Sequence, residues 1–221
     1  MKCFIFDLDG TLTDPKLGIC SCVQYAMEAA GMEPPPIDEL TDFIGPPLVV
    51  HFKERLGVDD NTALFMLDKY RERFSAVGIK QNEIYPGIAE MLEALYSRGA
   101  IIALGTSKPV EYASVILENF NIGQYFHVLA GNDLKESRST KSLVLEYALS
   151  RLEEQFGLKP CDCLMVGDRR YDIEAAGHFG MAAVAVGYGY GSADEIKKAD
   201  PAYYAKSVDE LTKLLLSLLS S

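Results

Sequence analysis

The chain has 221 residues, a length that allows one large domain or a core domain with a modest insert. Hydrophobic residues make up 48% and charged residues 24%, as in ordinary folded globular proteins, so extensive disorder is excluded. A formal net charge of -11 argues against nucleic acid and anionic membrane surfaces as partners, although a cleft with a few cations and a metal ion can still bind phosphate.

The compartment is expected to be the cytoplasm. No apolar run approaches the roughly 20 residues that span a bilayer, and the N-terminus lacks the long apolar segment of a signal peptide. The five cysteines are an odd number, and the two Cys-x-Cys pairs are spaced more tightly than zinc ligands usually are. We therefore expect reduced thiols and no membrane partner, whereas the oligomeric state cannot be read from the sequence.

The first predicted strand, Cys3–Phe6, leads directly into Asp7, Asp9 and Gly10. Two aspartates two residues apart point to the same side of an extended chain. In an open α/β sheet the carboxyl ends of the strands line the ligand crevice, and two carboxylates this close need a cation between them. A divalent metal with oxygen ligands is the natural counter-charge, while a simple Asp-Gly turn is the alternative.

The next segment contains helical patterns and no convincing strand between about Lys16 and Asn82. A Pro-rich turn at 34–36 separates two of its helices. We predict a helical insert at 16–82, placed within a core domain formed by 1–15 and 83–221.

The rest of the chain alternates short apolar runs with helical patterns. Unbroken apolar runs of four or five residues are typical of strands buried on both faces of a parallel sheet. We predict a Rossmann-like, doubly wound parallel α/β sheet that ends in an amphipathic helix at 208–218. Besides Cys3–Phe6, its strands are Ala100–Leu104, Val128–Ala130, Cys163–Val166 and Ala182–Val186.

The second strand ends in Thr106, Ser107 and Lys108, followed by Pro109 as the expected first residue of a helix. Hydroxyl groups and backbone N–H donors at a helix start suit a phosphate oxygen. The alternative is that Ser107 only caps the helix.

Two later segments also carry charged groups, one at an expected helix start and one after an expected strand. Lys141 opens a helix after a capping-type Ser-Thr pair, and Asp168 and Asp172 follow the fourth strand. Four residues apart, these two carboxylates share a face once the helix begins.

The Gly-Tyr-Gly-Tyr-Gly segment at 187–191 follows a strand and precedes a helix. It lacks the third glycine of the dinucleotide fingerprint and does not lie in the first strand-helix unit. We interpret it as a flexible loop near the mouth of the site.

These four motifs, in this order, resemble the haloacid-dehalogenase superfamily over nearly the whole chain. The resemblance implies that Asp7 is the nucleophile that becomes an aspartyl phosphate, and that Asp9 is the general acid and then the base. It further implies that Thr106 binds phosphate, with Gly10, Ser107 and Lys108 beside it, and that Lys141 steadies nucleophile and phosphate. The expected proline after that lysine is absent, so Lys135 and Arg138 remain alternatives, and Arg138 is also a phosphate-binding candidate.

The resemblance also implies a magnesium site and a substrate class. Mg²⁺ would be held by Asp7, the backbone carbonyl of Asp9, and Asp168, with Asp172 in support. The insert is similar to the helical cap of phosphoglycolate-phosphatase-like members, and its Gly45 turn is a candidate substrate contact. The expected activity is hydrolysis of a small phosphate monoester, phosphoglycolate-phosphatase-like, with a 5'-nucleotidase as the alternative and a phosphomutase or non-catalytic binding protein less favoured.

Overall fold

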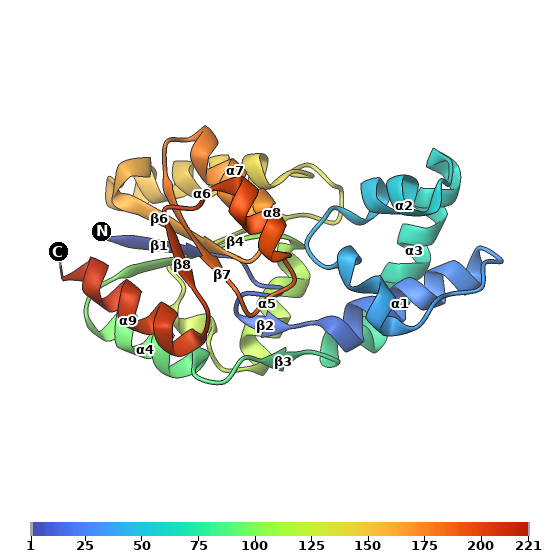
Figure 1. The fold of residues 1–221 in the computed structure, drawn as a ribbon, viewed down its shortest axis with the longest axis horizontal. Coiled ribbons are helices and arrows are strands. Elements are labelled where there is room, and N and C mark those ends of the chain that lie inside the picture. Colours follow the sequence, from blue (N-terminus) through green and yellow to red (C-terminus); the bar gives the residue numbers. More distant parts are fainter. Residues whose placement is uncertain (1, 221) are drawn as a thin grey trace. The chain divides into compact units, whose positions relative to one another are not determined.

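The computed structural model describes residues 2–220, which form two compact units (Figure 1). One unit combines Met1–Thr13 with Ile84–Ser221, and the other is Asp14–Glu83. The chain passes between them in two short paired strands, β2 (Thr13–Asp14) and β3 (Glu83–Ile84).

The larger unit is built on a six-stranded sheet in the order β5-β4-β1-β6-β7-β8. All neighbouring strands in it run parallel, so the predicted doubly wound parallel sheet is confirmed. The strands are β1 (Cys3–Phe6), β4 (Ile101–Pro109), β5 (Val128–Asn132), β6 (Cys163–Gly167), β7 (Ala182–Val186) and β8 (Tyr203–Ala205). The chain winds outward from β1 through β4 to β5 and then returns to β6 on the other side of β1. The strand order therefore reverses between β1 and β6, the place where α/β sheets bind their ligands.

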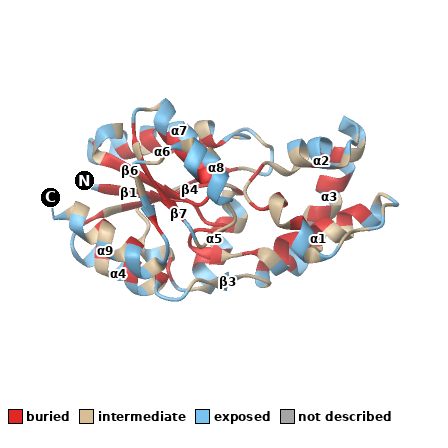
Figure 2. Ribbon diagram, viewed as in Figure 1, coloured by how far each residue is buried: buried red, intermediate tan, exposed pale blue. Residues whose placement is uncertain are grey.

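Helices cover both faces of this sheet (Figure 1). On one face lie α6 (Lys141–Phe156) and α7 (Arg170–His178), and on the other lie α4 (Ile88–Ser97) and α9 (Val208–Leu219). The remaining helices of this unit are α5 (Val110–Asn119), α8 (Ala193–Ala199) and the short 3-10 turns η3 (Gly123–Tyr125) and η4 (Pro160–Asp162). Strands covered on both sides must be apolar throughout, which is why the central strands are buried along their length (Figure 2).

Side-chain alternation in β1 divides the core between the two faces. Cys3 and Ile5 pack in one cluster with Leu145 and Leu149 of α6 and Ile173 of α7. Successive side chains of a strand point to opposite faces, so the two phenylalanines of β1 face the other helical layer. All four residues of the strand are completely buried. This burial fixes β1, and with it the position of the residues that follow.

The smaller unit contains helices α1 (Lys16–Ala29), α2 (Leu48–Leu56) and α3 (Asp60–Ala76) with 3-10 turns η1 (Ile37–Phe43) and η2 (Gly78–Lys80). Asp59 caps α3 by accepting a hydrogen bond from the Thr62 backbone N–H at 2.8 Å. Phe43, Phe52 and Phe74 are almost fully buried and form part of its core.

Pro109 is not the first residue of a helix, so that prediction is wrong. Its backbone, with φ -52° and ψ 130°, is extended, and it pairs with Asn132 of β5 after an irregularity in β4. The helix α5 begins at Val110 without a side-chain cap, so Ser107 does not cap it either. Proline fixes only φ, and the value of ψ decides between strand and helix.

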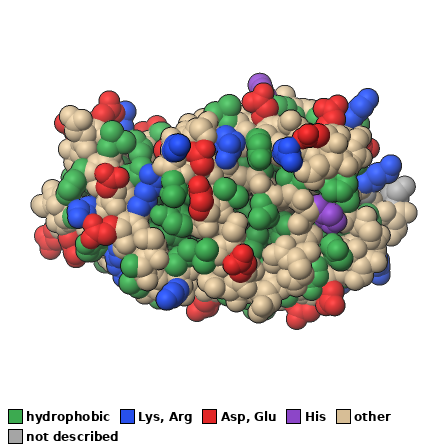
Figure 3. All heavy atoms as spheres, turned by 180° about the vertical axis from the view of Figure 1, so that it is seen from behind, with side chains coloured by type: hydrophobic (Ala, Val, Ile, Leu, Met, Phe, Trp, Pro, Cys, Tyr) green, Lys and Arg blue, Asp and Glu red, His purple; other side chains and the backbone are tan. Residues whose placement is uncertain are grey.

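The surface agrees with the acidic composition. On the face drawn in Figure 3, Lys and Arg side chains lie singly among acidic and apolar ones. None of the helices formed by residues 2–220 has the length and apolar character needed to cross a membrane. All five cysteines are free, and Cys161 is exposed while the others are buried.

Candidate active site

The predicted site residues of the larger unit follow neighbouring strands. Asp7 and Asp9 come after β1, Thr106 lies near the end of β4, and Asp168 comes after β6. Phe6 pairs in register with Leu104 on one side and Val166 on the other, and the Asp7 N–H donates to the Val166 carbonyl at 2.9 Å. The parallel register therefore brings these strand ends to one edge of the sheet.

Three carboxylates gather at this edge. One oxygen from each of Asp7, Asp168 and Asp172 lies within 4.8 Å of the other two. All three residues are buried, with exposed fractions of 4%, 0% and 1%. Asp172 is oriented by the Arg169 backbone N–H, which donates to its Oδ2 at 3.1 Å at the start of α7.

Lys141 is the cation that the structure brings to this acidic cluster. Its Nζ lies 2.9 Å from Asp7 Oδ1 and 2.7 Å from Asp172 Oδ1, and it donates to the Gly105 carbonyl at 2.9 Å. Burial by itself would lower the pKa of Lys141, but the charges of Asp172 and Asp7 outweigh burial, so its pKa is raised. The ammonium group therefore stays charged across the physiological pH range.

One ammonium group does not balance three carboxylates. Burial raises the pKa of Asp172 to about 6, against the opposing effect of Lys141. Burial also raises the pKa of Asp168 well above its ordinary value, and the charges of Asp172 and Asp7 add to the effect. A buried, oxygen-only donor set with excess negative charge fits a hard divalent cation such as Mg²⁺.

Asp9 lies apart from this cluster and has its own cation. Its Oδ2 is 2.8 Å from Lys108 Nζ, and both side chains are almost fully buried. Within residues 2–220 the other oxygen, Oδ1, is buried without a hydrogen-bond partner. Burial raises the pKa of Asp9, and the charge of Lys108 offsets this only in part. A carboxyl group with a raised pKa and a free oxygen can hold and release a proton.

The hydroxyl of Thr106 is buried and accepts a hydrogen bond from the Lys108 backbone N–H at 3.2 Å. Ser107, beside it, is half-buried. Gly10 lies against Asp168 with φ 79°, and a Cβ atom there would overlap the Asp168 carboxylate. Gly10 thus contacts the acidic cluster directly.

The alternatives to Lys141 lie in the 133–140 loop that precedes it. The Arg138 Nε donates to the Gly131 carbonyl at 2.7 Å, and its guanidinium group stacks 4.7 Å from the centre of the Tyr147 ring. Lys135 is exposed. Gly45 belongs to the smaller unit, where it lies in the turn before α2.

Two features of the site were missed by sequence reasoning. The first is the ion pair between Lys108 and Asp9, which the two-residue spacing of Thr106 and Lys108 in an extended strand could have indicated. The second is the 187–191 loop, whose Tyr190 N–H donates to Asp168 Oδ2 at 2.7 Å. The sequence placed this segment only near the mouth of the site, whereas the structure packs it directly against Asp168.

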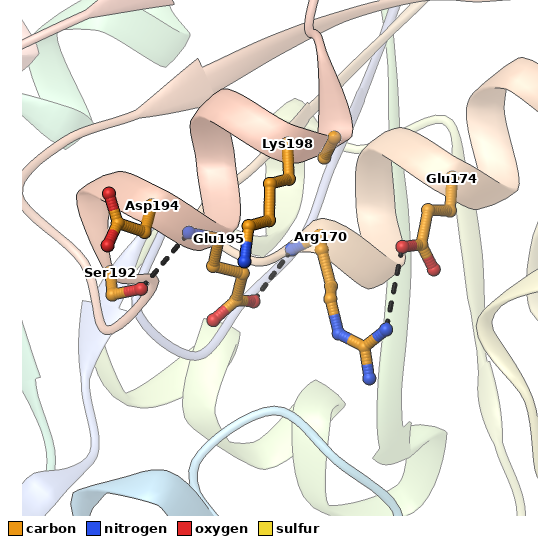
Figure 4. Close-up of a pocket in the computed structure, with 7 residues that line it drawn as sticks. Arg170, Glu174, Ser192, Asp194, Glu195 and Lys198 are labelled. Carbon is orange, nitrogen blue, oxygen red and sulfur yellow. Dashed lines mark hydrogen bonds and ion pairs between the residues drawn. The ribbon is translucent and has the colours of Figure 1, made fainter.

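A separate hollow of about 460 Å³ lies between α7 and α8 (Figure 4). Arg170 contacts two of its acidic side chains: the backbone N–H donates to Glu195 at 2.9 Å, and the guanidinium group lies 3.5 Å from Glu174. None of the predicted site residues lines it. The candidate active site at the strand ends is therefore a different site from this hollow.

Comparison with known proteins places the chain in a family. Residues 4–186 match the family model described as haloacid dehalogenase-like hydrolase. A 5'-nucleotidase of Pseudomonas aeruginosa is 38% identical over 213 residues, which cover 96% of this chain and 95% of that protein. A phosphoglycolate phosphatase of Vibrio parahaemolyticus is 29% identical, with 97% of this chain and 96% of that protein covered.

Two further relatives differ in name but share the fold. A protein of Mycobacterium tuberculosis named tyrosine-protein kinase PtkA is 38% identical over 96% of this chain and 71% of its own length. The crystal structure of a predicted phosphatase from Clostridium acetobutylicum has a TM-score of 0.92 and 37% identity, and the match covers 98% of this chain and 99% of that one. The chain described here belongs to the haloacid dehalogenase-like hydrolases.

Proposed function

We propose that this protein is a Mg²⁺-dependent phosphatase that hydrolyses a small phosphate monoester through an aspartyl phosphate on Asp7. The observation that carries the proposal is the buried Asp7 carboxylate, held 2.9 Å from Lys141 Nζ beside Asp168 and Asp172. Family membership and phosphatase-named relatives support the reaction class.

The metal would be held by the carboxylates of Asp7 and Asp168 together with the backbone carbonyl of Asp9. When bound, Mg²⁺ would neutralise negative charge on the phosphate as the nucleophile approaches. Asp172 would act in support, because it fixes Lys141 through a 2.7 Å ion pair. The excess negative charge of the cluster supports this assignment.

In the first step an Asp7 oxygen attacks phosphorus, and the bond between phosphorus and the leaving oxygen breaks. That oxygen takes the electron pair and receives a proton from Asp9. The Asp9 pKa, which burial raises, favours the protonated form that this step requires. Lys108, in contact with Asp9, stabilises the carboxylate that remains.

In the second step water attacks the phosphorus of the aspartyl phosphate while Asp9 takes a proton from that water. The bond between Asp7 and phosphorus breaks, phosphate leaves, and the nucleophile and the acid are restored. Lys141 and the Thr106 hydroxyl would stabilise the charge on the phosphate oxygens in both steps. Gly10 and Ser107 would add backbone or hydroxyl donors.

We propose the helical segment 16–82 as a cap domain and the source of substrate preference. The compact helical unit at Asp14–Glu83, inserted after the first long strand, supports this role. Gly45 is the candidate contact to the substrate from this segment, and Arg138 of the larger unit remains a phosphate-binding candidate.

Two substrate classes compete. The 29% identical phosphoglycolate phosphatase supports a small phosphorylated acid, and the 38% identical 5'-nucleotidase supports a nucleoside monophosphate. A panel of phosphoglycolate, nucleoside monophosphates and sugar phosphates, ranked by kcat/KM, decides between them. Phosphate transfer from ATP to tyrosine belongs on the same panel, because of the relative named as a kinase.

The mechanism is tested with Asp7→Asn, which keeps size and shape but removes the nucleophilic carboxylate. We expect phosphate release to disappear in this variant and in wild type with EDTA, while far-ultraviolet circular dichroism stays unchanged. Asp209→Asn, on the exposed surface of α9, is the matched control and should keep full activity. Full activity in Asp7→Asn or in the presence of EDTA contradicts the proposal.

A further inference from the structure

The 187–191 loop contacts Asp168, a candidate metal ligand. It also contacts the two segments, around Thr11 and Tyr85, at which the chain leaves and re-enters the larger unit; we call these the crossover segments. Tyr190 donates its backbone N–H to Asp168 Oδ2 at 2.7 Å. Two residues earlier, the Tyr188 hydroxyl donates to the Thr11 carbonyl at 3.0 Å. Between them, Gly189 lies so close to Asp168 and to the Gly10 carbonyl that a Cβ atom would overlap both.

These contacts close a ring. The Thr11 hydroxyl makes a long hydrogen bond of 3.5 Å to Asp168 Oδ1, so the two oxygens of Asp168 are held by Thr11 and by Tyr190. The backbone connects Tyr190 to Tyr188, and the hydrogen bond from the Tyr188 hydroxyl to the Thr11 carbonyl completes the ring. Breaking the ring at the Tyr188 hydroxyl releases the loop from Thr11 and leaves the rotamer of Asp168 less constrained.

Tyr188 also contacts the second crossover segment, where the chain re-enters the larger unit. The rings of Tyr188 and Tyr85 meet edge to face with centroids 5.0 Å apart, and the Tyr85 N–H donates to the Leu12 carbonyl at 3.1 Å. Thr13 and Ile84 are the residues at which this unit ends and resumes. Tyr188 thus contacts both crossover segments, Thr11 through its hydroxyl and Tyr85 through its ring.

We infer that Tyr188 is a positioning residue, which fixes the Gly187–Gly191 loop so that the Tyr190 N–H holds the Asp168 carboxylate in the orientation that binds the metal. This inference rests on the proposed metal site. It assigns a function to a segment that the phosphate chemistry itself does not use. Groups that orient metal ligands change metal affinity without touching the metal, typically by about 10–100-fold.

The hydroxyl of Tyr188 is suited to this task as a donor. Burial raises the pKa of Tyr188, and the nearby Tyr85 and Asp168 raise it further. The hydroxyl therefore keeps its proton at neutral pH. The hydrogen bond to Thr11 therefore does not depend on the protonation state of Tyr188 near neutral pH.

The test is isothermal titration of the full chain with MgCl₂, comparing wild type with Tyr188→Phe, which removes the hydroxyl and keeps the ring on Tyr85. We expect the Kd for Mg²⁺ to rise about 10-fold. Because the ligands themselves remain, kcat at saturating Mg²⁺ should stay within about twofold of wild type. Tyr25→Phe is the matched control, since it also removes a tyrosine hydroxyl that donates one hydrogen bond, to Glu72 at 2.9 Å, and it should bind Mg²⁺ as wild type does.

A second variant acts on the same loop through its backbone. Gly189→Ala places a methyl group against Asp168 and should weaken Mg²⁺ binding more than Tyr188→Phe, by about 100-fold. A merely structural role for the loop predicts lower melting temperatures in metal-free buffer with unchanged Mg²⁺ affinity in both variants. That result overturns the inference.

Asp168→Asn separates the failure of this inference from the failure of the proposed function. If Asp168→Asn binds Mg²⁺ as tightly as wild type, the metal assignment is overturned and the inference with it. If Asp168→Asn loses binding while Tyr188→Phe and Gly189→Ala keep it, the inference alone is overturned.

Discussion

Lys141→Met is the substitution that tests the site geometry most directly. Methionine fills a similar volume but removes the ammonium group, which lies within 2.9 Å of Asp7, Asp172 and the Gly105 carbonyl. The lysine side chain is 5% exposed, so water cannot replace these contacts without rearrangement. Breaking a buried ion pair by removing one partner costs about 3–5 kcal/mol of folding free energy.

The size of this loss depends on pH in a defined direction. Burial already raises the pKa of Asp172 to about 6 in the presence of Lys141, and loss of the lysine charge raises it further. A carboxyl group with a raised folded-state pKa stabilises the fold at low pH, and that stability is lost as pH rises through the folded-state pKa. The difference between wild type and Lys141→Met should therefore be about 3–5 kcal/mol at pH 8 and clearly smaller at pH 5, where Asp172 becomes neutral in both proteins.

The assay is urea denaturation at both pH values, in EDTA, followed by circular dichroism. Lys135→Met is the matched control, because Lys135 is an exposed lysine of the same segment, and its free energy of unfolding should stay within about 0.5 kcal/mol of wild type. A loss below about 1 kcal/mol at pH 8 in Lys141→Met would show that the buried contacts are not formed. An equal loss at pH 5 and pH 8 would refute the coupling to Asp172.

Three further changes probe other parts of the site. Asp168→Asn should raise the melting temperature of the metal-free protein at pH 8. Burial raises the pKa of Asp168 in the folded protein, so this group costs stability as pH rises above its unfolded-state pKa. The variant should also lose the upward shift with Mg²⁺ in thermal-shift assays, and a metal-free variant that is less stable than wild type contradicts this reasoning. Asp9→Asn should lower kcat by about 100-fold or more, because the variant cannot transfer the proton. The Kd for Mg²⁺ should change little, since the Asp9 side chain pairs with Lys108 outside the acidic cluster, and a parallel loss of Mg²⁺ affinity in calorimetry would refute this assignment. Thr140→Ala removes the side-chain cap at the start of α6 and should cost about 1 kcal/mol in urea denaturation, with an unchanged unfolding midpoint as the contrary result.

Much of the fold of the larger unit could be predicted, because buried strands and half-buried helices have different patterns of apolar residues. Strands covered by helices on both faces must be apolar along their length, so β1 and β7 were predicted to the residue. The ends of the other strands were less accurate. β4 continues to Pro109 because its last residues pair with β5 across an irregularity, and nothing in the local sequence distinguishes that pairing from a helix start.

The 187–191 loop shows which contacts a local pattern does not predict. Alternating glycines and tyrosines after a strand predict a loop, but they do not indicate its partners. In the fold, Gly189 is required by the closeness of Asp168, and Tyr188 finds an acceptor at Thr11, 177 residues away in the sequence. Contacts between residues so far apart in the sequence do not produce a recognisable pattern in either segment.

The sequence by itself determined the order of the five buried strands and their helices, because alternation and apolar runs reflect local burial, but it did not indicate the edge strand β8. It also determined which residue types stand at the strand ends, so the motif around Asp7 can be recognised from the order of residues alone. Only the tertiary structure decided which charges meet: Lys141, and neither Lys135 nor Arg138, reaches Asp7, while Lys108 turns to Asp9. Such pairings depend on distances of 2.7 to 2.9 Å between side chains of different strands and helices, and those distances are set by the packing of the whole sheet.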